Sequence, residues 1–417
     1  METLADSATF RRYLFFWSGQ LASLLGSSIA QFVIVWWITL ETESAVYLSV
    51  ATFAGFAPTV VLSPLAGVYV DRWNRKALIG VVDLLQALAT VSLIVMFWFN
   101  IVSIWHVIAI SIVRGVFQAF HFPAVSALVP LMVPSDKLSR MNGLNYLFSG
   151  VVNFVGPLAA ALLLEIWRIH QILWIDAATF IVALVPLLVI SIPSVTKKQE
   201  GKDIPSFRRD FIEGLAFIKS KEGLLALIVS ATVLNFLMMP LPTLSAYYVR
   251  VDHLGEAKDL AFIGASFQGG MLAGGLLMSV IKGFKKKMVV TAVFLYIGSL
   301  AYGIVALTPQ GMFWLMAAGV LVIGFSLPII NVSIQTIMQT VIPVNIFGRV
   351  NSVISSLANV ASPLGMVLSG PLAETVGTAN LYKSCSILEA LSLTLLWLFT
   401  DIRQVEKMAV QPPSSDS

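Results

Sequence analysis

The chain has 417 residues, of which 58% are hydrophobic and only 12% charged, and its formal net charge is +4. Soluble domains carry about 25% charged residues and leave roughly a quarter of their surface exposed even when large, so this composition excludes an ordinary soluble protein. The sequence lacks a basic face with interleaved aromatic residues, which is the pattern that indicates nucleic-acid binding. The single cysteine, Cys385, excludes an internal disulfide.

Twelve segments of mostly apolar residues follow one another along the chain, and each is long enough to cross a bilayer as a helix. They predict an all-α membrane protein with twelve transmembrane helices in two six-helix bundles. The first segment is too long for a signal peptide, so we expect it to be retained. The predicted spans are residues 13–39, 45–70, 77–98, 103–130, 142–164, 170–192, 222–248, 258–281, 287–307, 312–341, 350–374 and 379–400.

Basic residues lie almost entirely on one side of the predicted spans. The segments on the side of the N-terminus contain 21 Lys and Arg residues, whereas those on the opposite side contain 4. Cytoplasmic loops carry the excess of basic residues in membrane proteins. We therefore expect a multi-pass protein of the cell membrane with both termini in the cytoplasm.

The longest polar stretch, residues 194–220, follows the sixth predicted span. Within it, Phe211, Leu215 and Ile218 recur at helical spacing. This pattern predicts either an amphipathic helix on the inner membrane surface or a solvated linker. The predicted parts are an N-terminal bundle (1–193), this inter-bundle loop (194–220), a C-terminal bundle (221–403) and a cytoplasmic tail (404–417).

The two predicted bundles share residues at a constant spacing of 209 positions. The turns after the fourth and tenth spans carry the same Pro, Arg and Asn at this spacing, and two glycines recur with them. The recurrence indicates a half that is duplicated in the same orientation. The pairs are Pro134 with Pro343, Arg140 with Arg349, Asn142 with Asn351, Gly115 with Gly324, and Gly156 with Gly365.

The turn between the second and third spans carries a motif of glycine, acid and bases. It resembles the G-x-x-x-D-R-x-G-R-[RK] signature of major facilitator proteins, with Asn74 in place of the second glycine. The resemblance implies a cytoplasmic latch between the bundles, whereas the simpler alternative is that the bases only end the helix. The motif residues are Gly67, Asp71, Arg72, Arg75 and Lys76.

The fourth span contains the deepest charge of the chain. Arg114 lies about 11 residues from the outer end of this span, or roughly 16 Å into the bilayer. A charge at that depth costs at least about 2.5 kcal/mol, so it must face a partner or a cavity. Gln118 and His121 follow on the same helical face. The three residues predict a polar stripe along a substrate path, with helix packing as the alternative.

Two further polar stripes lie on the first and tenth spans. Helical spacing places the members of each stripe on one face. They are Gln20, Ser27 and Gln31 in the first span and Asn331, Gln335 and Gln339 in the tenth.

Asp83 and Glu389 are acids inside predicted spans and form a possible charge relay. Asp83 is expected to pair with Arg75 or Arg114, which would give it a structural role. Glu389 is remote from any base in sequence and is expected to form hydrogen bonds between helices.

Over its whole length the chain resembles the major facilitator superfamily, and within it the branch of macrolide-efflux proteins and enterobactin exporters. Besides the latch motif, this rests on residues 17–27, which read WSGQLASLLGS, and on residues 114–124, which run from Arg114 to Ala124. In this fold the first, fourth, seventh and tenth spans surround a central cavity, and all three stripes fall on such spans.

The resemblance implies a secondary transporter that exports a small amphipathic compound, such as a macrolide-like drug or a siderophore-like molecule. Proton antiport with alternating access is the expected mechanism, and a proton-coupled nutrient importer or a non-transporting membrane scaffold are the alternatives. The expected partners are the substrate, protons and the lipid bilayer, with no nucleic acid, and the protein is expected to be a monomer. No catalytic constellation, metal site or cofactor motif is found, so we expect no enzyme activity.

Overall fold

A computed structural model describes residues 6–191, 207–221, 223–281, 283–343 and 346–408. Within these ranges every regular element is a helix. The chain divides into two compact units, the first formed by residues 1–197 with 249–265 and the second by residues 198–248 with 266–417. Each unit is described on its own.

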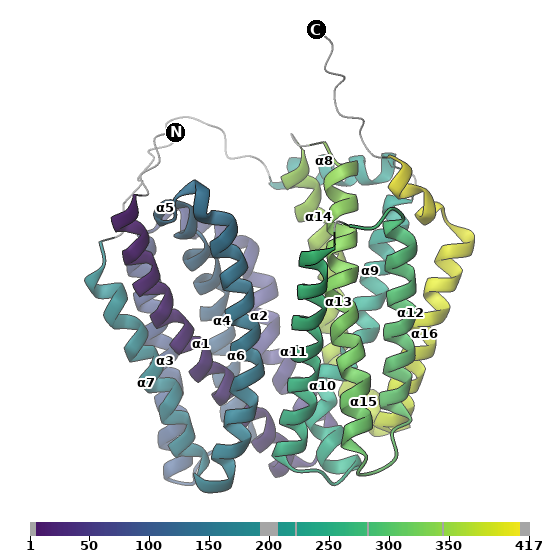
Figure 1. The fold of residues 1–417 in the computed structure, drawn as a ribbon. Coiled ribbons are helices and arrows are strands. Elements are labelled where there is room, and N and C mark those ends of the chain that lie inside the picture. The colour runs from purple at the N-terminus through teal and green to yellow at the C-terminus, as the bar shows by residue number, and fades with distance from the viewer. Residues whose placement is uncertain (1–5, 192–206, 222, 282, 344–345, 409–417) are drawn as a thin grey trace. The chain divides into compact units, whose positions relative to one another are not determined.

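The first unit contains six long helices (Figure 1). Most are hydrophobic all round, as expected where lipid covers one side and other helices the other. Their bounds are α1 (Ser7–Thr42), α2 (Ala45–Arg72), α3 (Arg75–Trp98), α4 (Ile104–Ser126), α6 (Leu138–Ile166) and α7 (Ile169–Val189), with the short α5 (Val129–Met132) and the turn η1 (Ser135–Lys137) between α4 and α6.

The second unit repeats this order, but two of its spans are broken. The seventh span is interrupted before Pro240 and the eleventh before Pro363, because proline lacks the N–H that would continue the helix. The elements are α8 (Phe207–Ser220), α9 (Leu224–Met238), α10 (Pro240–Tyr247), η2 (Tyr248–Asp252), α11 (Ala257–Val280), α12 (Lys287–Ala306), α13 (Phe313–Val341), α14 (Phe347–Asn359), α15 (Ser362–Val376), α16 (Thr378–Phe399) and η3 (Asp401–Met408); most of η2 and the first turns of α11 belong to the first unit.

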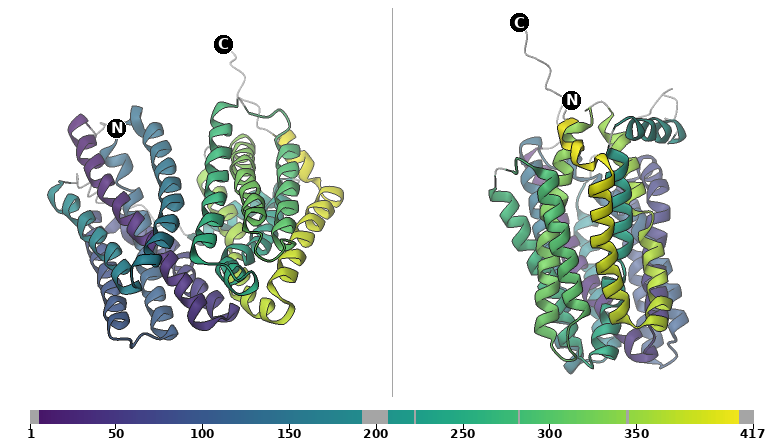
Figure 2. Two further views of the ribbon diagram at one scale, coloured as in Figure 1. Left: turned by 60° about the horizontal axis from the view of Figure 1, so that its bottom comes forward. Right: turned by 90° about the vertical axis from the view of Figure 1, so that its right-hand side faces the viewer.

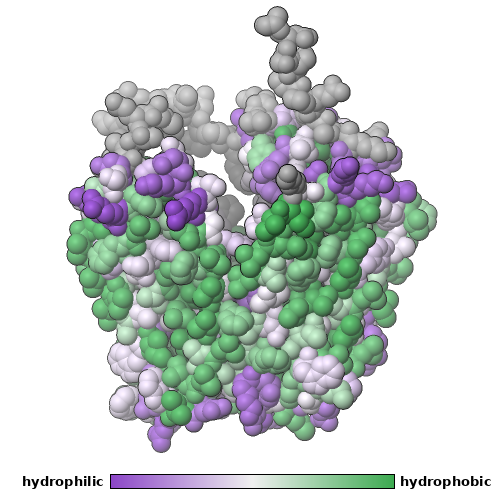
Figure 3. Space-filling view, in the orientation of Figure 1, coloured by the Kyte–Doolittle hydropathy of each residue, from purple (hydrophilic) through white to green (hydrophobic). Residues whose placement is uncertain are grey.

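Twelve of the described spans are long and apolar enough to cross a membrane, which confirms the predicted number. On the face shown in Figure 3, hydrophobic residues cover the flanks of the helices and hydrophilic residues gather at their ends. Exposed apolar flanks of this size are unfavourable in water and suit contact with lipid tails. The chain is therefore a multi-pass α-helical membrane protein.

Helix bounds recur between the units at the spacing of 209 positions found in the sequence. α4 begins at Ile104 and α13 at Phe313, and α7 begins at Ile169 and α16 at Thr378. The equivalent glycines also make equivalent contacts. A Cβ on Gly115 would collide with the backbone oxygen of Gly55 on α2, and one on Gly324 would collide with that of Phe267 on α11. Both positions therefore require glycine for close helix approach.

The helix α8 packs on the end of the second unit. Its Phe211, Phe217 and Ile218 join a buried apolar cluster with Val350 and Val353 of α14. Figure 2 (right) shows α8 running across the ends of the long helices. Protein thus covers the part of its apolar face that these three residues form, whereas Ile212 is 53% exposed.

An exposed ion pair lies beside this packing. Glu213 of α8 accepts a hydrogen bond of 2.8 Å from Arg349 of α14, the arginine that recurs at the spacing of 209. Both side chains are nearly half exposed, so the pair contributes little to stability.

The segment η3 folds back onto the start of α12. The carboxylate of Glu406 accepts hydrogen bonds from the backbone N–H groups of Lys287 (2.9 Å) and Met288 (3.2 Å). An acid at this position satisfies free N–H groups and matches the positive end of the helix dipole. Ile402 and Val405 of η3 are buried in the apolar cluster of the second unit, so this segment is an integral part of that unit.

We expect Gly115→Ala to lower the thermal unfolding temperature of the purified protein, because its Cβ forces α2 and α4 apart. Overpacking of this kind costs about 1–3 kcal/mol. Gly143→Ala on α6 is the matched control, since no atom lies within 4 Å of its added Cβ. Helix propensity alone should leave that variant as stable as the wild type or slightly more stable. Equal unfolding temperatures for the two variants would contradict the close-contact role of Gly115.

Candidate functional site

Arg114 forms an ion pair with Asp176 in the interior of the first unit. The guanidinium Nη1 of Arg114 lies 3.1 Å from Oδ2 of Asp176, and the aspartate side chain is 0% exposed. α4 packs on α2 and α3, and α7 packs on α1 and α3, so the pair joins helices from two sides of the bundle. The depth of Arg114 in its span is tolerable because the opposite charge is supplied from α7.

Hydroxyl groups complete the environment of this pair. Ser27 of α1 donates to Oδ1 of Asp176 at 2.8 Å, and Thr90 of α3 donates to Oδ2 at 2.8 Å. Arg114 in turn donates to the Thr90 hydroxyl at 3.2 Å. Four helices thus contribute to one buried network, in which both aspartate oxygens have partners.

A second acid–base pair lies two helical turns further along α4. The Nε2 atom of His121 is 3.0 Å from Oδ1 of Asp83 on α3, and the aspartate is 1% exposed. These two atoms have the distance of an ion pair but not the alignment of a hydrogen bond. Gln20 of α1 donates to the other carboxylate oxygen at 3.3 Å.

The expected pairing of Asp83 with Arg114 is wrong, because the structure pairs Arg114 with Asp176. Neither Asp176 nor Thr90 was among the predicted site residues. A depth argument could have found Asp176. It lies seven residues into α7, about 10 Å along the axis, and Arg114 lies ten residues into α4, about 15 Å along it, with both helices starting on the same side of the membrane.

The other members of the three stripes lie on helix surfaces. Their side chains are exposed within their own units, and Asn331 also lines a cavity described below. They are Gln31 on α1, Gln118 on α4, and Asn331, Gln335 and Gln339 on α13.

Only part of the latch motif is described at side-chain level. Gly67, Asp71 and Arg72 belong to α2, but the surroundings of Gly67 and the side chains of Asp71 and Arg72 lie outside the described structure. Asn74 is the N-cap of α3 and accepts a hydrogen bond from the N–H of Ala77 with an ordinary negative φ, so the turn needs no left-handed residue. The motif thus ends one helix and begins the next.

The bases at the start of α3 also have local partners. Lys76 donates to the backbone oxygens of Leu188 (2.9 Å) and Ile190 (2.6 Å), at the end of α7. A cation at a helix C-terminus matches the helix dipole. Arg75, the first residue of α3, also has an interaction partner.

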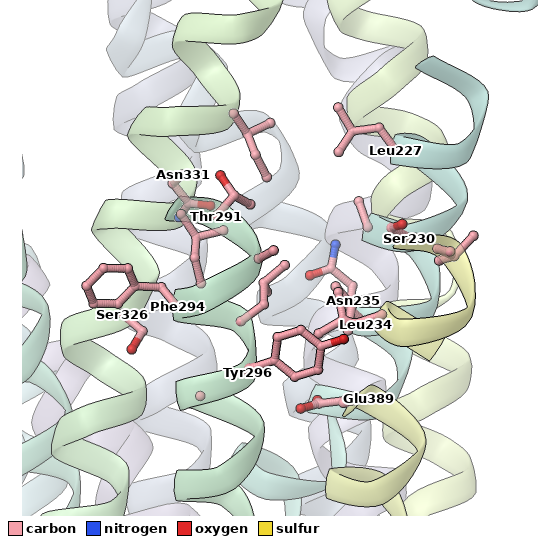
Figure 4. A pocket seen from close by; sticks show the side chains of 18 of the residues that line it. Leu227, Ser230, Leu234, Asn235, Thr291, Phe294, Tyr296, Ser326, Asn331 and Glu389 are labelled. Atoms are coloured by element: carbon pink, nitrogen blue, oxygen red, sulfur yellow. The ribbon is translucent and has the colours of Figure 1, made fainter. Parts of the chain in front are cut away.

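Glu389 of α16 lines a cavity of about 210 Å³ inside the second unit (Figure 4). The residue is 5% exposed, and its Oε2 accepts a hydrogen bond of 3.1 Å from the hydroxyl of Ser299 on α12. This contact agrees with the predicted hydrogen bonding between helices. Most of the remaining wall is apolar, with Leu227, Leu234 and Phe294 among the lining side chains. Among the residues that the structure describes, no cluster of His, Cys, Asp and Glu could hold a metal ion.

Comparison with known proteins places this geometry in a family. Residues 16–366 match the family model described as Major Facilitator Superfamily. Macrolide efflux protein A of Streptococcus pyogenes is 29% identical over 391 residues, which cover 94% of this chain and 96% of that protein. Macrolide efflux protein A of Enterococcus faecalis is 30% identical over 324 residues, covering 78% and 99%.

Solved structures of transporters share the fold. A bacterial homologue of the iron transporter ferroportin, crystallised in an inward-facing state, aligns with a TM-score of 0.71 over 93% of this chain and 98% of its own. The sequence identity is 14%, so this likeness concerns the fold alone.

A double-mutant cycle should show strong coupling between Arg114 and Asp176. Arg114→Gln or Asp176→Asn alone leaves a buried charge unpaired, which costs about 3–5 kcal/mol. The double variant should be less destabilised than the two single changes added together, with a coupling energy of about 1–3 kcal/mol. Denaturant unfolding of the purified variants measures these energies.

The exposed pair Arg349 and Glu213 provides the matched control, with an expected coupling below about 1 kcal/mol. Additive effects at Arg114 and Asp176 would contradict the view that they act as one ion pair.

Proposed function

Because the chain belongs to the Major Facilitator Superfamily, we propose that it exports a small amphipathic compound in exchange for protons. The observation that carries this proposal is the similarity to macrolide efflux proteins over nearly the whole length of both chains. The duplicated arrangement of helices supports it, since parallel repeats of this kind serve alternating access. The excess of basic residues on one side of the spans supports a place in the cell membrane with both termini in the cytoplasm.

The two buried pairs of the first unit suggest different roles: one stabilises the fold and the other carries the proton. Arg114 is charged at any physiological pH, so its pair with Asp176 serves as a fixed crosslink. In the second buried pair, by contrast, the imidazole and the carboxylate can each bind and release a proton. We therefore assign the coupling proton to the pair of Asp83 and His121. Gln20 of α1 donates a hydrogen bond to this carboxylate, so the bond depends on the charge of Asp83.

The exposed stripe residues are proposed to line the substrate path. Gln31, Gln118, Gln335 and Gln339 offer hydrogen bonds without a net charge, which suits a compound with both apolar and polar parts. Gly67, Asp71 and Arg72 are proposed to form the latch that the signature implies. Glu389 is assigned a separate role below.

Proton-driven export should disappear when the gradient is abolished. One proton entering down about 100 mV releases about 2.3 kcal/mol. A tenfold gradient costs about 1.4 kcal/mol, so one proton sustains roughly a fortyfold gradient of a neutral compound.

Everted membrane vesicles should therefore accumulate a labelled macrolide, and a protonophore should release it. Accumulation that a protonophore leaves unchanged would exclude proton coupling. Accumulation only in right-side-out vesicles would indicate an importer instead.

Replacement of the coupling pair should flatten the pH dependence of transport. In everted vesicles the wild-type rate should change with pH, because this pair must bind and release a proton in each cycle. His121→Gln and Asp83→Asn should each remove this change, while substrate exchange without a gradient continues.

His106→Gln is the matched control on the same helix, because His106 lies exposed at the first turn of α4. A wild-type pH profile in His121→Gln would contradict the assignment of the proton to this pair.

A further inference from the structure

The repeat allows the buried site of the first unit to be compared with the second unit, position by position. At the spacing of 209, Thr90 corresponds to Ser299, and Asp176 corresponds to Cys385. Glu389 lies one helical turn after Cys385 on α16. Ser299 donates to Glu389 as Thr90 donates to Asp176, so both units contain a buried acid held by a hydroxyl of the neighbouring helix.

The basic partner is present in only one of the two units. Arg114 and His121 correspond to Ile323 and Ile330 on α13, and both isoleucines line the cavity next to Glu389. The positions that hold an arginine and a histidine in the first unit therefore border a cavity in the second. Among the described residues, no Lys, Arg or His lines this cavity.

The walls of the cavity restrict what can bind there. Glu389 is the one carboxylate among the described lining residues, whereas Ca²⁺ sites combine six to eight oxygen ligands and Mg²⁺ requires near-ideal octahedral geometry. Phe294, Tyr296 and Trp397 line the same space, and aromatic rings attract organic ammonium groups. Asn235 and Ser230 add hydrogen-bonding groups on α9. The volume of about 210 Å³ greatly exceeds the roughly 10–15 Å³ that one water needs.

We propose that this cavity binds a lipophilic organic ammonium ion, whose charge is matched by Glu389. The ligand takes the electrostatic place that Arg114 holds in the first unit, and its apolar body contacts the leucines and aromatic rings. That the exported compound is such a cation rests on the proposed export function. Binding of the cation in this cavity can be tested without measuring transport.

The test measures binding of benzyltrimethylammonium and of its neutral carbon isostere, neopentylbenzene, to the purified full-length protein at pH 8. Glu389→Gln keeps the shape of the side chain and removes its charge. We expect this change to weaken binding of the cation about tenfold or more, the range for a hydrogen bond or contact with a charged group. Binding of the neutral isostere should change less than about threefold.

Two further variants make the result specific. Ile323→Arg installs the arginine of the first unit beside Glu389 and should abolish binding of the cation. Glu374→Gln removes an exposed acid from α15 of the same unit and should leave binding unchanged. If Ile323→Arg does not fold, the comparison of cation and isostere in Glu389→Gln decides alone. Equal weakening of both ligands, or none, would overturn the proposal.

The outcome is separable from that of the proposed function. Binding of the cation that depends on Glu389, together with absence of export in vesicles, would overturn export and leave this site in place. If export depends on protons but cation binding does not depend on Glu389, the proposed site is overturned and the export function is not.

Discussion

A charge inside an apolar helix bundle must find its counter-charge within the protein, because lipid offers neither water nor hydrogen bonds. In the first unit this requirement is met by Asp176, which lies 3.1 Å from Arg114. The hydroxyls of Ser27 and Thr90 each donate a hydrogen bond to one oxygen of the aspartate. Since these four residues belong to α1, α3, α4 and α7, one ion pair fixes the mutual depth of four helices.

Much of this architecture could be predicted from the sequence. Apolar runs of about 20 residues define the spans, because length and hydropathy are local properties that lipid selects directly. The depth of Arg114 and the shared face of Arg114 and His121 followed from helical spacing alone. The constant spacing of 209 residues likewise anticipated the glycines at equivalent helix contacts.

The choice of partners could not be predicted in the same way. Asp83 and Asp176 were both available to Arg114, and only the packing of α7 against α1 and α3 brings the second within reach. Such adjacency depends on tertiary packing and not on any periodicity of one helix. The same applies to Asn74, whose capping role depends on the backbone of the turn. The cavity beside Glu389 also escaped prediction, because it arises from side chains of several helices.

The absence of a basic side chain beside Glu389 in the described structure has an electrical consequence. An exporter that exchanges one monovalent cation for one proton moves no net charge across the bilayer. The membrane potential then performs no work on the cycle, and the pH difference alone supplies the free energy. A difference of one pH unit sustains about a tenfold gradient of such a cation, because both gradients obey the same logarithmic law. A cell that dissipates its membrane potential but keeps its pH difference would retain export of the cation. Export of a neutral compound by the same protein would weaken.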